Sequence, residues 1–288
     1  MFKRFILLAL LVASCGKPPA TPKAKPLLLV SIAPYRFLTE QIAGPDFEVK
    51  TVVPMAANPH SFEPTSHQVT KMGEGLVWFR IGEPFENKIL PVLNKHNPKL
   101  IVQDLRDGIS LIEEVHELSC KQCSMDHLDR HIWMSPKLAA QQAALIEKTL
   151  SKQFPEMQEQ FAKNLENLSL QLIALDLEIH EILKPIVKRT LLVSHPAFAY
   201  FCKEYNFTQL SVEYEGKDPR PKHLEQILQE AVSQSMEIAL ALPQYNNKGA
   251  QLIAEKIHVP IHLIDPYSSN YFEMMRKLAH LIADPYAN

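Results

Sequence analysis

The stretch from Pro155 to Lys184, PEMQEQFAKNLENLSLQLIALDLEIHEILK, decides how the rest of the 288-residue chain is interpreted. It contains no glycine, and its apolar residues are spaced alternately by four and three, at Phe161, Leu165, Leu168, Leu172, Leu175, Ile179 and Ile182. This period predicts one amphipathic α-helix, which would be roughly 45 Å long. Pro155 suits the first turn of such a helix, and Pro185 would stop it.

Two explanations fit a helix of this length. Its apolar face could form the seam of a coiled-coil dimer, or the helix could be an intramolecular strut packed along two lobes. We favour the strut because strand and helix patterns occur on both sides of it. The predicted strands lie in PLLLVSIAP (26–34) and FEVKTVVP (47–54) before the helix, and in TLLVSHPAF (190–198), MEIALALP (236–243) and VPIHLIDP (259–266) after it.

Strands that alternate with helices predict an α/β fold with parallel sheets flanked by helices. We place an N-terminal α/β lobe at residues 27–150, the linking backbone helix at 151–187 and a C-terminal α/β lobe at 188–288. A cleft should lie between the lobes. Because the chain has only eight glycines and a rigid helical crossover, we expect local opening around the loops of His131 and Asp265 rather than wide hinge closure.

The first 15 residues, MFKRFILLALLVASC, have the composition of an export signal, with Lys3 and Arg4 ahead of an apolar run. The run is shorter than the roughly 20 residues of a membrane-spanning helix, so we expect the segment to be processed. VASC resembles a bacterial lipobox, which would make Cys15 the lipidated first residue of the mature chain; the alternative is a simple secretory signal. Residues 16–26 would then form a stiff Pro/Lys-rich tether.

The composition indicates a globular protein and limits the partners that it could bind. The chain has 46% apolar residues, which is enough for a buried core. Its 30 basic and 32 acidic side chains are scattered and give a formal net charge of −2. This pattern provides no basic surface for a phosphate backbone, so we exclude nucleic acid as a partner.

Four titratable residues occupy similar places in the pattern. His60 follows VKTVVPMAANP, His131 lies in DRHIWMSP, His195 closes TLLVSHP, and Asp265 closes VPIHLIDP. At least three of them lie beyond the C-terminal end of a predicted strand, the edge at which open parallel sheets bind ligands. Three imidazoles and one carboxylate suit a borderline divalent metal, zinc above all. For any single histidine the alternative is a solvated or hydrogen-bonded side chain.

Five motifs carry a family resemblance: NPHSFEPT, HIWMSP, SHPAFAYFCKEYNF, EGKDPRPKHLEQI and DPYSSNYFEMMRKLA. Their order and spacing resemble the zinc- and manganese-binding lipoproteins of bacterial ABC importers, the cluster 9 (A-I) solute-binding proteins. The likeness runs from about Ser31 to the C-terminus. It implies two pseudo-symmetric lobes with one metal between them, bound by His60, His131, His195 and Asp265.

The ligand types indicate which metal the site would prefer. In such proteins the manganese-specific members tend to carry a carboxylate where this chain has His195. Imidazole is a better ligand for zinc than for manganese, which prefers harder oxygen ligands. We therefore expect one Zn²⁺ as cargo, with Mn²⁺ and Fe²⁺ left open. Because each histidine must be neutral to bind, affinity should fall on acidification through roughly pH 6 to 5.

A second cluster lies just before the second implied ligand, His131, in HELSCKQCSMDHLDRH (116–131), where zinc-specific relatives often carry a histidine-rich loop. His116, Cys120, Cys123 and His127 have plausible spacing for an accessory zinc site. The alternatives are a disulfide between Cys120 and Cys123, which an oxidising compartment favours, or no interaction. Cys202 reads as a buried core residue.

The resemblance implies a non-catalytic, lipid-anchored receptor in the periplasm or on the outer face of the cell membrane. It would pass metal to the permease of an ABC importer with its cytoplasmic ATPase, and we expect a monomer. A competing hypothesis is a mononuclear zinc hydrolase with Glu63 or Glu215 as general base, but the chain has no H-E-x-x-H or G-x-S-x-G motif. A third is a surface adhesin with a structural metal.

Overall fold

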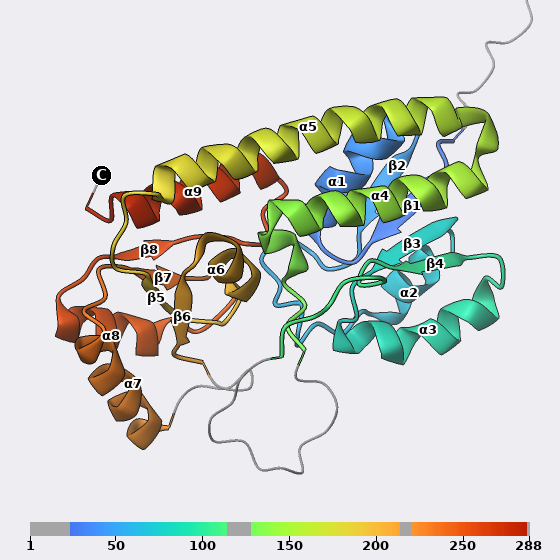
Figure 1. Ribbon diagram of the computed structural model, residues 1–288. Coiled ribbons are helices and arrows are strands. Elements are labelled where there is room, and N and C mark those ends of the chain that lie inside the picture. The colour runs from blue at the N-terminus through green and yellow to red at the C-terminus, as the bar shows by residue number, and fades with distance from the viewer. Residues whose placement is uncertain (1–23, 114–127, 214–219, 287–288) are drawn as a thin grey trace, which may run out of the picture.

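Two four-stranded parallel sheets form the frame of the molecule. The computed structural model describes residues 24–113, 128–213 and 220–286. The strand orders are β2-β1-β3-β4 and β6-β5-β7-β8, so the two halves repeat one connection pattern. The sheets lie at opposite ends of the molecule, and one helix, α5, runs across both (Figure 1). The predicted α/β fold of two similar lobes is confirmed.

The first lobe is built around β1, which is the apolar run LLLV and lies between two neighbours. Such a strand is covered on both faces, which explains its lack of alternation. The next helix has Pro34 in its first turn and ends at Gly44, whose φ of 74° favours glycine. The elements are β1 (Leu27–Val30), α1 (Ala33–Ala43), β2 (Glu48–Thr51), α2 (Ser66–Met72), β3 (Val77–Arg80), α3 (Pro84–His96), β4 (Ile101–Asp104), the 3₁₀ turn η1 (Ile132–Met134) and α4 (Pro136–Gln153).

The second lobe follows the same plan around β5, the run TLLV. Two of its helices end with residues in the left-handed conformation, Asn206 at φ 57° and His258 at φ 59°. The elements are β5 (Thr190–Val193), α6 (Ala199–Tyr205), β6 (Thr208–Ser211), α7 (Pro221–Ser233), β7 (Ala239–Ala241), α8 (Lys248–Ile257), β8 (Ile261–Leu263) and α9 (Tyr271–Ala283).

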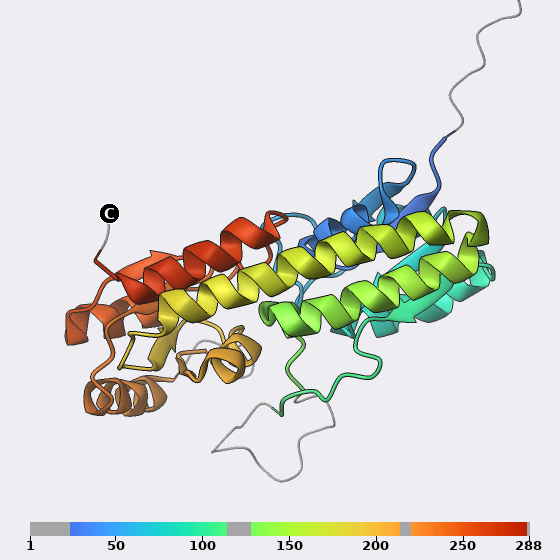
Figure 2. The same ribbon diagram turned by 45° about the horizontal axis from the view of Figure 1, so that its top comes forward.

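The predicted long helix is α5 (Gln158–Leu183), preceded by the 3₁₀ turn η2 (Pro155–Met157). It packs against α1 and α4 of the first lobe and α9 of the second, as both views show (Figures 1 and 2). Most of its predicted apolar face is buried: Phe161, Leu168, Leu172, Leu175 and Ile179. The strut explanation therefore holds, because this face is used within the chain. Residues 151–153 belong to α4 rather than to the linking helix, and the domain division itself stays a prediction.

The hydrophobic core crosses the boundary between the lobes. One cluster of buried residues contains Leu28 and Trp78 from the first sheet, Leu172 from α5, and Leu240 from the second sheet. A smaller cluster lies between the second sheet and helices α7 and α8. Because side chains of both lobes share one packed cluster with α5, the lobes are held against each other by burial as well as by the chain connection.

Within the described residues, we find no helix that combines the length and the apolar character needed to cross a bilayer.

Candidate metal centre

Three histidines from separate parts of the chain meet between the lobes. His60 lies in the loop after β2, His131 immediately before η1, and His195 two residues after β5. One ring nitrogen of each lies within 4.8 Å of the others, and the Nε2 atoms of His60 and His195 are 3.2 Å apart. The first two come from the N-terminal lobe and the third from the C-terminal lobe, so the cluster spans the predicted cleft.

Local hydrogen bonds fix the backbone at two of the three histidines. The N–H of His60 donates to Oδ1 of Asn58 at 2.9 Å, and Pro59 between them is buried. The N–H of His131 donates to Oδ1 of Asp129 at 2.7 Å. An Asn or Asp two residues before the histidine thus accepts from its N–H in both loops, which is how these side chains stabilise tight turns. His195 takes its position from the end of β5.

Each histidine has a carboxylate behind it. Glu83 lies 2.9 Å from Nδ1 of His60, Asp129 lies 2.7 Å from Nδ1 of His131, and Glu213 lies 2.6 Å from Nδ1 of His195. An ionised carboxylate only accepts, so each Nδ1 carries the proton and donates it. The lone pair of each neutral ring is then on Nε2, the side on which the rings converge. Carboxylates in this position orient metal-binding histidines and raise their basicity.

Burial sets the charge of the site. It lowers the pKa of His195 well below the usual value, and His60 and His131 lower that pKa further. Burial alone would raise the pKa of Glu83, but His60 and Arg130 outweigh it, and the net shift is downward. His195 is therefore neutral and Glu83 ionised at neutral pH, the combination that presents a lone pair to a cation.

Asp265, the fourth predicted ligand, is near the cluster but is not part of it. It follows β8 by two residues, as the sequence predicted. Its Oδ1 accepts from Nε2 of Gln244 at 2.8 Å and from the N–H of Tyr267 at 2.9 Å. The group of ligand atoms within 4.8 Å of one another contains the three histidines without Asp265.

Two tyrosines that the sequence did not single out complete the surroundings. The Tyr267 hydroxyl is 3.0 Å from Nε2 of His131, and 3.2 Å from the Tyr245 hydroxyl. The Tyr245 ring stacks on His195 with centroids 3.9 Å apart and planes at 13°. Burial raises the pKa of Tyr267 well above its usual value, so it is a phenol. For Tyr267, the only sign in the sequence of a role at the site was its position in DPY, two residues after Asp265.

Aromatic side chains from both lobes pack around His131. The Trp133 ring lies 5.3 Å from that of His131, and its Nε1 donates to the carbonyl of Pro266 at 2.8 Å. Tyr200 donates to the carbonyl of Asp129 at 2.8 Å. These contacts tie the second histidine loop to the C-terminal lobe.

Other predicted residues lie elsewhere. Glu63 is exposed and pairs with Lys88 at 2.7 Å, so it does not face the histidines in this arrangement. Cys202 is buried, as predicted. Six residues of the predictions lie outside the described residues: Cys15, His116, Cys120, Cys123, His127 and Glu215.

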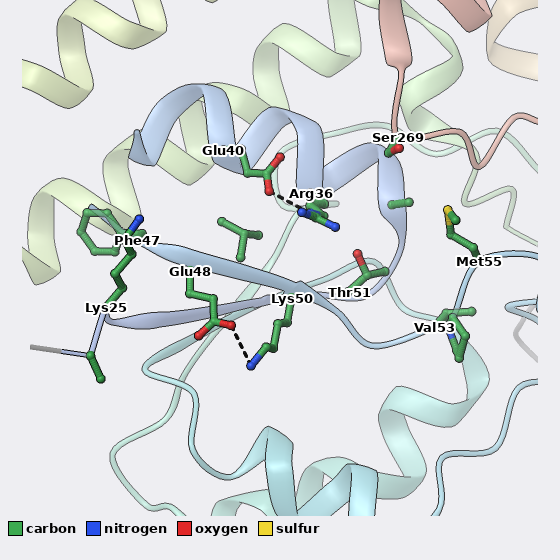
Figure 3. A pocket seen from close by; sticks show the side chains of 14 residues that line it. Lys25, Arg36, Glu40, Phe47, Glu48, Lys50, Thr51, Val53, Met55 and Ser269 are labelled. Atoms are coloured by element: carbon green, nitrogen blue, oxygen red, sulfur yellow. Dashed lines mark hydrogen bonds and ion pairs between the residues drawn. The ribbon is translucent and has the colours of Figure 1, made fainter. Parts of the chain in front are cut away.

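A separate hollow of about 750 Å³ lies over β2 and α1 (Figure 3). None of the three histidines lines it. Four of its five charged side chains pair with one another, Arg36 with Glu40 and Lys50 with Glu48, each at 2.8 Å. The fifth, Lys25, donates from Nζ to the carbonyl of Pro45. This hollow is therefore distinct from the metal centre.

Comparison with known proteins decides the family. A family model described as zinc-uptake complex component A, periplasmic (ZnuA), matches residues 28–284. The chain belongs to this family. The predicted resemblance to metal-binding solute-binding proteins of ABC importers is thereby confirmed.

Individual members of the family agree along most of the chain. A relative from Chlamydia trachomatis is 30% identical over 283 residues, which cover 97% of this chain and 98% of the relative. The high-affinity zinc uptake system protein ZnuA of Bacillus subtilis is 28% identical over 239 residues, which cover 77% and 75%. A crystal structure of ZnuA has a TM-score of 0.83 at 30% identity and covers 91% of this chain and 99% of that chain.

Proposed function

We propose that the chain captures one divalent metal ion, zinc foremost, between its lobes and delivers it to a membrane permease without catalysing a reaction. The observation that carries the proposal is the set of three inward Nε2 lone pairs, each backed by a carboxylate. Membership in a zinc-uptake family supports it independently.

The spacing of the donors supports zinc. With Zn–N bonds of about 2.0–2.1 Å, two ligands of a tetrahedral site are roughly 3.3–3.4 Å apart. The His60 and His195 Nε2 atoms, at 3.2 Å, are close to this spacing. Mn²⁺ and Fe²⁺ remain alternative cargoes, because the metal that a site binds in the cell depends on its geometry, its ligand types and the metals available.

The proposed ligands are His60, His131, His195 and Asp265. A zinc titration against a competing chelator tests the histidines: each histidine-to-alanine variant should lose most of the affinity, while His67→Ala, an exposed histidine on α2, should keep it. Wild-type affinity in His60→Ala or His195→Ala would contradict the proposal. Elemental analysis should find one metal ion per chain.

Asp265 needs a test of its own because it also makes structural hydrogen bonds. Asp265→Asn keeps an oxygen for Gln244 and for the Tyr267 N–H but removes the negative charge. We expect this variant to fold normally and to bind zinc more weakly. Unchanged zinc affinity would remove Asp265 from the ligand set and leave it as a loop residue.

The proposed location is the periplasm or the outer face of the cell membrane, with Cys15 as the lipid anchor and a permease and its ATPase as partners. The signal-like start of the chain and the family's periplasmic description support this. Cys15→Ser should move the protein from the membrane fraction to the soluble envelope fraction. Membrane retention of that variant would contradict lipidation at Cys15.

A further inference from the structure

The phenol of Tyr267 reaches across the cleft to a metal-binding nitrogen. Tyr267 belongs to the loop between β8 and α9 in the C-terminal lobe, whereas His131 belongs to the N-terminal lobe. The Tyr267 hydroxyl and the His131 Nε2 are 3.0 Å apart, and both side chains are buried. This is a hydrogen bond between the lobes at the centre of the proposed site.

The direction of this hydrogen bond follows from its neighbours. Nδ1 of His131 donates to Asp129 at 2.7 Å, so Nε2 of the neutral ring has only a lone pair. The Tyr267 hydroxyl must therefore donate to it. The hydroxyl of Tyr245, at 3.2 Å, can donate to the Tyr267 oxygen in turn. The phenol proton thus occupies the lone pair that a metal ion would use.

We propose that Tyr267 is a competing donor that weakens metal binding and speeds metal release. This inference rests on the proposed function, since it assumes that His131 is a ligand. A cation can bind Nε2 of His131 only after the Tyr267 hydroxyl has withdrawn. When the metal leaves, the phenol returns to the same lone pair, so the hydrogen bond favours release.

The loop that carries Tyr267 links this exchange to Asp265. The N–H of Tyr267 donates to Oδ1 of Asp265, and the carbonyl of Pro266 accepts from Trp133 of the N-terminal lobe. Withdrawal of the phenol therefore perturbs the residue that holds the Asp265 carboxylate. A single shift of the loop between β8 and α9 would therefore withdraw the Tyr267 hydroxyl proton from His131 and free the Asp265 carboxylate to bind the metal.

The test is Tyr267→Phe, which keeps the ring against Trp133 and removes only the hydroxyl. A net hydrogen bond corresponds to about a two- to tenfold change in an equilibrium constant. We expect zinc affinity, measured by chelator competition, to rise by that factor and zinc release into excess chelator to slow. The matched control is Tyr245→Phe, which loses a hydroxyl one step further away and keeps its stacking on His195; its effect should be smaller.

The outcomes separate this inference from the proposed function. Failure of the wild-type protein to bind zinc would refute the proposed function. If the wild-type protein binds zinc and Tyr267→Phe binds it equally or more weakly, only the proposal that the Tyr267 hydroxyl competes with the metal is overturned. Weaker binding by the variant would show that the hydroxyl supports metal binding.

A second measurement does not depend on metal. In chelator-treated protein labelled with ¹⁵N-histidine, the Nε2 signal of His131 should be that of a hydrogen-bonded acceptor. It should shift downfield in Tyr267→Phe, while the Nε2 signals of His60 and His195 stay in place. A His131 signal typical of a free acceptor in the wild-type protein would refute the hydrogen bond even if the variant failed to fold.

Discussion

Glu213 shows how a carboxylate can control the imidazole of a proposed ligand, His195. It lies 2.6 Å from Nδ1 of His195, and the Tyr245 ring covers the face of the same imidazole. The carboxylate fixes which nitrogen carries the proton and therefore which one points toward His60. The pairs Glu83–His60 and Asp129–His131 work in the same way.

Removal of the carboxylate behind His195 should therefore weaken binding without removing a ligand. For Glu213→Gln we expect zinc affinity to fall about 10- to 100-fold, because the imidazole loses orientation and basicity. Chelator competition measures this loss. Glu63→Gln, which changes an exposed glutamate paired with Lys88, should bind zinc as the wild type does. Equal affinities of the two variants would contradict a role for Glu213.

The choice of metal can be tested at His195. A harder oxygen ligand at this position should favour manganese. Because His195→Glu alone would place two carboxylates together, the variant to measure is His195→Glu with Glu213→Gln. We expect the ratio of zinc to manganese affinity to fall by about tenfold or more in competition titrations. An unchanged ratio would count against His195 as a ligand.

The lowered pKa of His195 should also reduce the dependence of zinc affinity on pH. Metal binding displaces protons from histidine ligands, so affinity falls as the histidines become protonated. Burial lowers the pKa of His195 well below its usual value, so this ring stays neutral as the pH falls below about 6.5. Between pH 6.5 and 5.5, three histidines with an ordinary pKa of about 6.5 would lower log affinity by about 2.2, and two would lower it by about 1.5. We expect a fall of about 1.5 or less, and a fall of about 2.2 would show that His195 titrates normally.

At the scale of elements, α5 has two apolar sides with different roles. Leu172 is 1% exposed and packs in the shared core, whereas Leu170, two residues earlier, is 61% exposed. The buried side connects α1, α4 and α9, so it carries the contact between the lobes.

A matched pair of substitutions on α5 tests this difference. Leu172→Ala should reduce the free energy of unfolding by about 2–5 kcal/mol, because it leaves a cavity in the core. Leu170→Ala should change it by about 0.5 kcal/mol or less. Chemical denaturation of both variants measures the difference. Similar losses would mean that the exposed side is also covered in solution.

At the scale of the whole molecule, a rigid helix and a shared core limit how the site can open. The core cluster joins both sheets through α5, and the loop of Tyr267 is tied to the N-terminal lobe by hydrogen bonds to His131 and from Trp133. Rotation of one lobe away from the other would separate the side chains of the core cluster that both lobes share. A shift of the loop between β8 and α9 would mainly break the loop's own hydrogen bonds with His131 and Trp133.

Small-angle scattering with and without zinc tests this limit. We expect the same radius of gyration and the same scattering mass, that of a monomer, in both states. Hydrogen exchange should change on zinc addition mainly at the Tyr267 N–H, because the shift of this loop alters its hydrogen bond to Asp265. A large change in the scattering profile would show that the lobes rotate and that local opening is wrong.

The sequence by itself determined the two-lobed α/β class, the long helix and five of the eight strands in the described residues. The spacing of Phe161, Leu168 and Leu175 indicated α5 because burial of one side of a helix imposes its own period. The apolar runs LLLV and TLLV indicated the two central strands because a strand covered on both faces is apolar without alternation. His60, His131 and His195 were recognisable because their motifs resemble a family and because strand ends share an edge.

Only the tertiary structure decided what surrounds the histidines. Glu83 and Glu213 are 23 and 18 residues away from the rings they contact, and Tyr267 is 136 residues from His131. No local period connects such residues, because their contacts depend on how loops from two sheets meet once the core has packed. The tautomer of each ring and the hydrogen bond that competes with the metal are therefore properties of the fold.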